Sequence, residues 1–156
     1  MALEIERKFL VDHEAWEKIE KPVGVPLRQG YMVMDAQKAI RIRLTQDKGF
    51  ITIKGETKGS VRNEFDYAIP KEDAIQLLDI FCPWEVSKRR YLLSFEGKTW
   101  EVDVFEGKNS GLIVAEIELK SADEIFEKPG WIGEEVTDDA RYYNACLAEH
   151  PYSEWT

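Results

Sequence analysis

Charged residues recur at every second position along several short segments of this 156-residue chain. Near the start, Glu4, Glu6 and Lys8 alternate with apolar residues, and Arg7 is the exception on the apolar side. Because successive side chains of a β-strand point to opposite faces of a sheet, this spacing places the three charges on one face. The segment 3–11 is therefore predicted to be a strand with one charged and one apolar face.

The same spacing returns on later segments, and acidic and basic residues concentrate on different strands. The groups are Arg41 and Arg43; Thr52 and Lys54; Arg62, Glu64 and Asp66; Lys88 and Arg90; and Glu116, Glu118 and Lys120. One explanation is a sheet with a solvated face, where charged residues are normal. The other is a sheet that closes with this face inward, so that the charges must be paired, hydrated or bound to a ligand. Across the whole set we favour the second explanation, which predicts a polar tunnel.

The rest of the pattern is mainly extended, with a few short helices. Strands are predicted at 3–11, 26–35, 39–46, 49–54, 61–69, 84–95, 98–106 and 113–121. Helices are predicted at 13–20, 70–80, 121–128 and 139–149. Glycine-containing turns at residues 47–49 and 96–98 are typical of hairpins between neighbouring strands.

Strands joined by hairpins favour an antiparallel sheet over a parallel βαβ arrangement. Closure of that sheet removes its exposed edges. The predicted fold class is α+β, mainly β: an eight-stranded antiparallel closed barrel that forms a tunnel with a polar charged lumen, with several short helices packed outside. The chain has no repeat, low-complexity tract or obvious linker, so a single domain over 1–156 is expected.

Composition narrows the choice of partners. A net charge of −9 argues against duplex nucleic acid, whose binding depends on neutralising phosphates, but it does not exclude a small polyphosphate. No apolar run is long enough to cross a bilayer, and no signal peptide is visible. Cys82 and Cys146 lack metal-ligand spacing and are predicted to be buried reduced thiols, so a cytoplasmic location is expected.

The charges on the predicted inner face suit a particular chemistry. Carboxylates two residues apart on adjacent strands can converge on a hard cation such as Mg²⁺ or Mn²⁺. Glu4, Glu6, Glu116 and Glu118 would supply four of them. Arginine and lysine bind the oxygens of a polyphosphate. Together these groups are what phosphoryl transfer to water or an alcohol requires. The sequence shows neither a Walker-type phosphate loop nor a Cys/His zinc pattern.

The histidines and most aromatic residues are given structural roles. His13 and His150 are predicted to be surface or helix-cap residues. Trp16, Trp84, Trp100 and Tyr91 are predicted to pack between barrel and helices. For Tyr31 a lumen position and an outer position are both left open.

The order of these motifs resembles the CYTH superfamily, also called triphosphate tunnel metalloenzymes. The N-terminal Glu4-x-Glu6-x-Lys8 is similar to its ExExK signature. Further matches are Gln29-Gly30-Tyr31, Arg41-x-Arg43, Thr52-x-Lys54, Arg62-x-Glu64, Lys88-x-Arg90, Glu101-Val102-Asp103-Val104-Phe105, Ala115-Glu116-Ile117-Glu118-Leu119, Glu135-Val136-Thr137 and Arg141-Tyr142-x-Asn144-x-x-Leu147-Ala148. The resemblance covers essentially the whole chain, and its nearest likeness is to short bacterial proteins that hydrolyse inorganic tripolyphosphate.

The resemblance implies a tunnel that binds triphosphates with Mg²⁺ or Mn²⁺, and it implies site residues. The implied catalytic group is Glu4, Glu6, Lys8, Glu116 and Glu118. The implied metal-binding acidic residues are Glu4, Glu6, Asp103, Glu116 and Glu118. The implied substrate-binding residues are Lys8, Arg41, Arg43, Lys54, Glu64, Lys88, Arg90 and Arg141, the last reaching the tunnel mouth from the C-terminal helix.

The leading hypothesis is a metal-dependent triphosphatase that converts tripolyphosphate to diphosphate and phosphate. A nucleoside or thiamine triphosphatase or an adenylate cyclase could use the same tunnel. A non-catalytic polyphosphate- or nucleotide-binding module is the third alternative, although a pure anion binder gains nothing from four carboxylates. The expected partner is a small triphosphate, with no nucleic acid and no membrane, and the protein is expected to be a monomer or a homodimer.

Overall fold

The computed structural model describes residues 3–35 and 37–155. Strands and helices follow one another in the order β1 (Leu3–Val11), α1 (His13–Lys18), β2 (Val25–Met34), β3 (Lys38–Leu44), β4 (Gly49–Gly55), β5 (Val61–Ile69), α2 (Lys71–Phe81), β6 (Trp84–Phe95), β7 (Lys98–Phe105), β8 (Ile113–Glu118), β9 (Ile132–Glu135) and α3 (Asn144–Glu149). Short 3-10 turns are η1 (Gly107–Asn109), η2 (Ala140–Tyr142) and η3 (Tyr152–Glu154).

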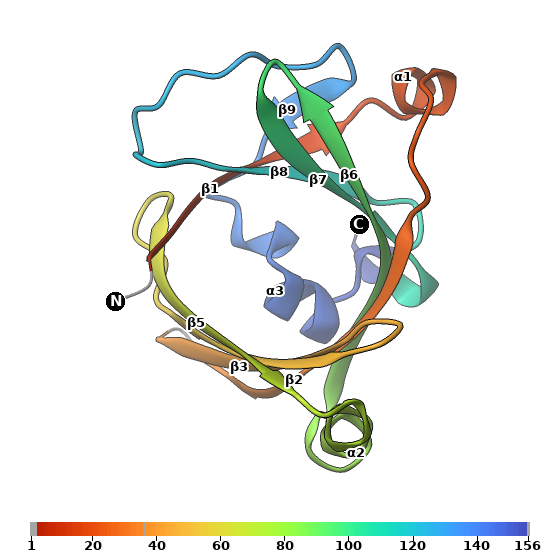
Figure 1. Cartoon of the computed structure of the whole chain (residues 1–156), viewed down its shortest axis with the longest axis vertical. Coiled ribbons are helices and arrows are strands. Elements are labelled where there is room, and N and C mark those ends of the chain that lie inside the picture. Colours follow the sequence, from red (N-terminus) through yellow and green to blue (C-terminus); the bar gives the residue numbers. More distant parts are fainter. Residues whose placement is uncertain (1–2, 36, 156) are drawn as a thin grey trace.

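The strands form one antiparallel sheet that closes on itself (Figure 1). Their order is β5-β4-β3-β2-β6-β7-β8-β1, with β9 added beside β1. The first strand closes the barrel by changing partner along its length: it pairs with β5 at Leu3–Ile5 and with β8 at Glu6–Leu10. The predicted eight-stranded antiparallel barrel is therefore confirmed, with one extra strand.

Two predictions of local structure are wrong, and one strand was not predicted. The segment 121–128 contains no helix, because Phe126 packs against Phe9 and Trp100 from an irregular chain while Ile125 is exposed. Strand β9 was not predicted. The C-terminal helix begins at Asn144 rather than near 139, because Tyr143 has an extended backbone after the η2 turn.

The helices begin where local chemistry favours them. Asp12 caps α1 by accepting a hydrogen bond from the backbone N–H of Ala15 at 3.0 Å. Glu72 and Asp73 lie in the first turn of α2, where negative charge suits the helix dipole. This helix packs tightly on Gly30, where an added Cβ would lie 2.7 Å from the Cβ of Cys82. Glycine at this strand position therefore allows α2 to cover the sheet.

Two apolar clusters lie outside the barrel. The larger one contains Trp16, Trp100 and Trp131, with Tyr91 packed edge-on to Trp16 at 5.5 Å. The smaller one joins α2 to the sheet through Ile42, Ala74 and Leu78. The predicted outer positions of Trp16, Trp100 and Tyr91 are confirmed. His13 and His150 are exposed, at the first residue of α1 and at the C-cap of α3.

Helix α3 departs from the prediction that the helices pack outside. Its Leu147 is completely buried against Val86, Phe105 and Val114, which share their strand faces with Lys88, Asp103 and Glu116. Figure 1 looks through the barrel and shows α3 within the ring of strands. Because this end of the inner face is apolar, α3 can close it.

Other inner-face positions follow from the same alternation. Trp84 shares the Lys88 face of β6 and, with Leu147, lines a groove next to α3, so its predicted outer position is wrong. Tyr31 lies on the inner face, where its hydroxyl accepts a hydrogen bond from Gln29. Cys82 and Cys146 are free, as predicted, but half-buried rather than buried.

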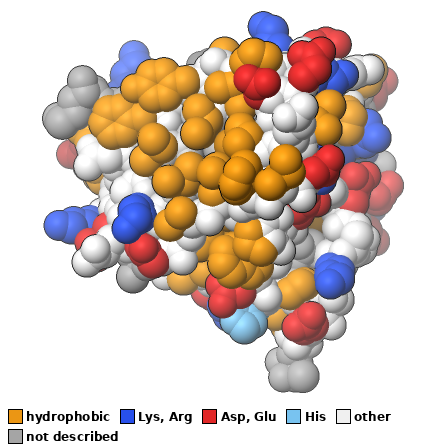
Figure 2. All heavy atoms as spheres, turned by 90° about the horizontal axis from the view of Figure 1, so that it is seen from below, with side chains coloured by type: hydrophobic (Ala, Val, Ile, Leu, Met, Phe, Trp, Pro, Cys, Tyr) orange, Lys and Arg blue, Asp and Glu red, His pale blue; other side chains and the backbone are white. Residues whose placement is uncertain are grey.

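The outer surface over α2 and strands β3 to β5 carries many apolar side chains (Figure 2). Ile53, Phe65 and Tyr67 are exposed on the strands, and Ile80 and Phe81 on the helix. No helix in the described part of the chain is both long enough and apolar enough to cross a membrane.

Candidate active site

The barrel encloses a cavity of about 470 Å³ whose lining is almost entirely charged. Seven strands and the start of α3 contribute to it. The lining residues are Leu3, Glu4, Glu6, Lys8, Arg41, Arg43, Lys54, Arg62, Glu64, Asp66, Arg90, Glu101, Glu116, Glu118 and Asn144. The alternation seen in the sequence therefore does bring separate segments to one internal space.

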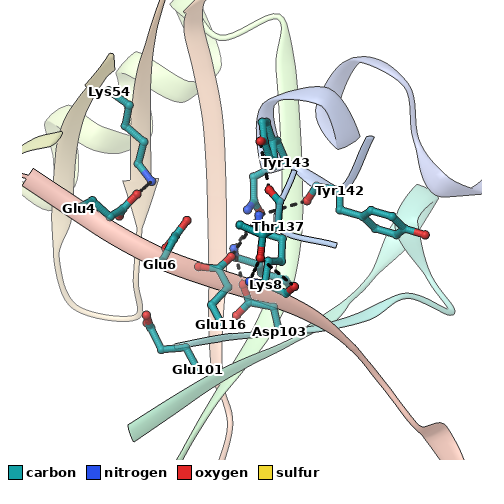
Figure 3. Close-up of polar contacts among 12 residues, drawn as sticks. Glu4, Glu6, Lys8, Lys54, Glu101, Asp103, Glu116, Thr137, Tyr142 and Tyr143 are labelled. Atoms are coloured by element: carbon teal, nitrogen blue, oxygen red, sulfur yellow. Dashed lines mark hydrogen bonds and ion pairs between the residues drawn. The ribbon is translucent and has the colours of Figure 1, made fainter. Parts of the chain in front are cut away.

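One side of the cavity is acidic. Strands β1 and β8 are neighbours in a register that pairs Glu6 with Glu118 and Lys8 with Glu116. The next pairing, between β8 and β7, sets Glu101 opposite Glu116. Figure 3 shows Glu4, Glu6, Glu101 and Glu116 pointing into the same space. The four predicted carboxylates Glu4, Glu6, Glu116 and Glu118 all line the cavity.

Neighbouring carboxylates on the acidic side shift each other's pKa. Burial raises the pKa of Glu6 well above its usual range, and the charges of Glu116 and Glu4 raise it further. Burial acts in the same direction on Glu116, but Lys8 and a hydrogen bond from Glu6 outweigh it and hold that pKa well below its usual range. A second pair behaves similarly, with the pKa of Glu64 raised to about 7 by burial and by its hydrogen bond to Glu4. Crowded carboxylates of this kind are stabilised by a cation.

The opposite side of the cavity is basic. Arg41 and Arg43 come from β3, and both line the cavity. Among the described residues neither forms an ion pair with a carboxylate. Burial lowers the pKa of Arg43 to about 9, and the positive charges of Arg41 and Arg90 add to this effect. The Nε of Arg41 is buried and has no hydrogen-bond partner in the part of the chain that the structure describes. These two side chains therefore present positive charge that the protein does not balance locally.

Other cations around the lumen do have carboxylate partners. Lys8 pairs with Glu116 at 3.3 Å, and Lys54 and Arg62 both reach Glu4, at 3.5 and 3.1 Å. Through these pairs the acidic side of the cavity is held in place by neighbouring strands.

Lys88, Arg90 and Asp103 form the most enclosed network. The Lys88 amine lies 2.7 Å from Asp103 Oδ2 and donates to Asn144 Oδ1 at 2.8 Å. The Arg90 guanidinium binds both oxygens of Asp103, at 2.7 and 2.9 Å, and also Glu101. Lys88 and Asp103, predicted to bind phosphate and metal, thus lie beside the cavity rather than in its lining. Their fully buried charges satisfy each other.

Residues 142–144 cover one end of the lumen. The Lys8 amine donates to the carbonyl of Tyr142 at 3.4 Å and lies 5.2 Å from the centre of the Tyr143 ring (Figure 3). Asn144 accepts from Lys88 and lines the cavity. A second cavity of about 330 Å³, which residues 143–146 help to line, shares Arg41, Lys54, Arg62 and Asn144 with the first.

Arg141 is not where the sequence places it. It belongs to the η2 turn rather than the C-terminal helix, and its exposed side chain pairs with Asp139 at 2.7 Å. Because the helix begins three residues later, Arg141 points outward and does not line the central cavity.

Four polar or charged lining residues were not assigned to the site from the sequence: Arg62, Asp66, Glu101 and Asn144. The first three could have been found from the alternation of side chains along a strand, because each stands two positions from an assigned residue on the same strand face. Asn144 carried no such signal, because its position depends on where α3 begins.

Comparisons with known proteins agree with this geometry. The sequence model of the CYTH domain family matches residues 2–145. A protein from Acetivibrio thermocellus named inorganic triphosphatase is 47% identical over 153 residues, or 97% of each chain. One of the same name from Nitrosomonas europaea is 39% identical over 150 residues, covering 93% of this chain and 96% of its own.

Solved structures give the same result. A crystal structure of an inorganic triphosphatase matches with a TM-score of 0.66 and 36% identity, covering 93% of this chain and 97% of that one. A protein from Pyrococcus horikoshii, 22% identical with a TM-score of 0.58, covers 77% of this chain and 81% of its own and shares the fold.

Proposed function

Because this chain belongs to the CYTH domain family, we infer that it is a hydrolase that cleaves a phosphoanhydride bond of a triphosphate. We propose inorganic tripolyphosphate as the substrate, with diphosphate and phosphate as the products. Two relatives with the name inorganic triphosphatase, each aligned over nearly its full length, support this choice.

The observation that carries the proposal is the pair of arginines on β3. Both guanidinium groups line a water-accessible cavity and, within residues 3–35 and 37–155, have no carboxylate partner, and Arg41 keeps a buried N–H with no acceptor there. A buried donor of this kind normally has a partner, and an anionic oxygen is the strongest one. Phosphate groups would supply such oxygens to Arg41, Arg43 and Lys54.

The carboxylates suit a divalent cation, for which we propose Mg²⁺ or Mn²⁺. Among the described residues no three acidic, histidine or cysteine side chains already converge at ligand distance. The raised pKa of Glu6 and the pKa of Glu64, raised to about 7, support this choice, because burial and neighbouring carboxylates disfavour the negative charge of both groups. Glu4, Glu6, Glu116 and Glu118 would hold the ion, which supplies Lewis-acid polarisation of a phosphoryl oxygen.

The chain's own groups then divide the work. Arg41, Arg43 and Lys54 hold the phosphate oxygens and fix the direction of the P–O bond to be broken. A carboxylate of the acidic side accepts a proton from the attacking water, which forms the new P–O bond as the diphosphate leaves. Lys8, which lines the same cavity and pairs with Glu116, would balance charge that develops on the departing group.

The test measures phosphate release from tripolyphosphate, ATP and thiamine triphosphate, each with Mg²⁺ and with Mn²⁺. The proposal expects fastest release from tripolyphosphate and a loss of at least about 100-fold in Glu4→Ala and Glu6→Ala. Retained activity in both variants would sink the assignment of the acidic side. Formation of cyclic AMP from ATP would replace the hydrolase by a cyclase.

We also propose that the protein works in the cytoplasm. The free state of Cys82 and Cys146 supports a reducing compartment.

A further inference from the structure

We propose that Thr52 and Gln29 are positioning residues that hold Arg41 and Arg43 in place without neutralising their charge. The proposal rests on the phosphate-binding function proposed above. Both residues are completely buried polar side chains on the inner face of the barrel, and neither carries a charge.

Thr52 lies directly opposite Arg41 in the pairing of β3 with β4. Its hydroxyl oxygen accepts a hydrogen bond from Arg41 Nη2 at 3.0 Å. The same hydroxyl donates to Asp66 Oδ1 at 2.6 Å, and Asp66 lies opposite Thr52 on β5. Thr52 therefore stands between a cation and a carboxylate. It fixes the direction of the guanidinium while keeping Asp66 from pairing with it.

Gln29 does the same for Arg43 from the other neighbouring strand. The two residues are opposite each other in the pairing of β2 with β3. Gln29 Oε1 accepts from Arg43 Nε at 3.3 Å, and Gln29 Nε2 donates to the Tyr31 hydroxyl at 3.2 Å. Because a guanidinium can only donate, the amide turns its neutral oxygen to Arg43 and its N–H groups to the Tyr31 hydroxyl, which can accept.

The barrel contains its own counterexample. On β6 and β7 the residue opposite Arg90 is Asp103, which binds the guanidinium with both oxygens. The same cross-strand position thus holds threonine or glutamine beside the β3 arginines and aspartate beside Arg90. A carboxylate at the first two positions would compete with phosphate for the guanidinium, whereas a neutral oxygen leaves the charge available.

The Thr52 step is tested with Thr52→Val and Thr52→Ser, measuring KM and kcat for tripolyphosphate. Loss of the hydroxyl in Thr52→Val is expected to raise KM about ten-fold or more with a smaller change in kcat, and Thr52→Ser is expected to restore KM to within about three-fold of the unmodified protein. The matched control is Thr99→Val, the same change on an exposed strand residue outside the cavity lining, which should leave KM unchanged. Equal KM values in Thr52→Val and Thr52→Ser overturn the proposal.

The need for a neutral oxygen opposite Arg43 is tested with Gln29→Glu, which keeps an acceptor oxygen there and adds a negative charge. If Gln29 acted only by accepting a hydrogen bond from Arg43, Gln29→Glu would keep the KM of the unmodified protein. The proposal expects KM to rise about ten-fold or more while the melting temperature stays the same or increases, because Arg43 gains a counter-ion. Unchanged KM, or a fall in melting temperature that accounts for the loss, contradicts it.

Failure of the proposed function and failure of the positioning role give different results. If the unmodified protein releases no phosphate from any triphosphate, the proposed function fails. Binding of tripolyphosphate by calorimetry, in the presence of Mg²⁺, then still ranks the variants. If the unmodified protein is active and the four variants share its KM, only the positioning role is lost.

Discussion

The inner face of the barrel uses cations in two different ways. On β3, Arg41 and Arg43 are held by the neutral side chains of Thr52 and Gln29. On β6, Lys88 and Arg90 are held by Asp103, with distances near 2.7 Å. Both pairs lie on the inner face of the barrel and follow the same two-residue spacing, so the difference comes from what stands opposite them.

The difference separates binding from stability. A cation without a counter-ion destabilises the free protein but can attract an anionic ligand, as the lowered pKa of Arg43 indicates. A cation paired with a buried carboxylate is satisfied already, and the pKa of Arg90 is raised because Asp103 outweighs the effect of burial. The β3 side is therefore prepared for phosphate, and the β6–β7 side holds the barrel and α3 together through Lys88 and Asn144.

The largest expected effect is on stability when Asp103 is removed. Asp103→Ala leaves Lys88 buried without its carboxylate, which should cost about 3–5 kcal/mol in the free energy of unfolding measured with urea. The matched control is Asp139→Ala, which removes the partner of the exposed Arg141 and should have little effect. Similar losses in both variants would show that burial does not distinguish the pairs.

A large effect on activity, but not on stability, is expected on β3. Arg41→Gln should lower kcat/KM for tripolyphosphate by about 10–100-fold, because a charge-assisted hydrogen bond to phosphate is lost. The melting temperature should stay equal or rise, since an unpaired buried charge is removed. A fall in melting temperature as large as that of Asp103→Ala would contradict the prediction, because Arg41 would then stabilise the fold as Asp103 does.

Acid should weaken the β6–β7 side. Burial opposes ionisation of Asp103, but Lys88 and Arg90 prevail and hold its pKa in the folded state well below the usual range. Stability from this group is therefore present above the pKa of aspartate in the unfolded chain, about 3.9, and is lost as pH falls below it. Urea unfolding from pH 7 to 3 should show a steeper decline for the unmodified protein than for Asp103→Ala. Parallel curves would contradict this assignment.

The smallest expected effect concerns salt. Added NaCl should weaken tripolyphosphate binding a few-fold, because chloride and screening act on the solvent-accessible charges of the cavity. The free energy contributed by Asp103, measured as the difference between the unmodified protein and Asp103→Ala, should change less, since that carboxylate is only 2% exposed. A larger effect of salt on the Asp103 contribution than on tripolyphosphate binding would contradict this prediction.

The alternation of charges was sufficient to predict the barrel and most of the lumen. Strand parity alone brings Glu4, Glu6, Arg41, Arg43 and Glu116 to one face, and closure of the sheet then brings them together. Parity does not reveal which charges pair, because that depends on strand register and side-chain direction. For this reason Lys88 and Asp103 were assigned to ligand binding, although the structure directs them at each other.

Short and irregular segments were also not predicted correctly from the sequence. Strand β9 has only four residues, Ile132–Glu135, and its stability comes from pairing with β1 and from the Arg7–Glu135 ion pair rather than from its own pattern. The apolar residues near 121–128 suggested a helix, but packing of Phe126 into the aromatic cluster determines that segment. Both segments are held by contacts with β1, which lies more than a hundred residues earlier in the chain.

The most direct test of the account is the affinity of Arg43→Gln for tripolyphosphate, measured by calorimetry without divalent metal, so that the substrate is not hydrolysed, beside a thermal melt of the same protein. If the uncompensated charge on β3 binds the substrate, the dissociation constant should rise at least about ten-fold while the melting temperature does not fall. An unchanged dissociation constant would contradict the account, because phosphate would then be held by other residues.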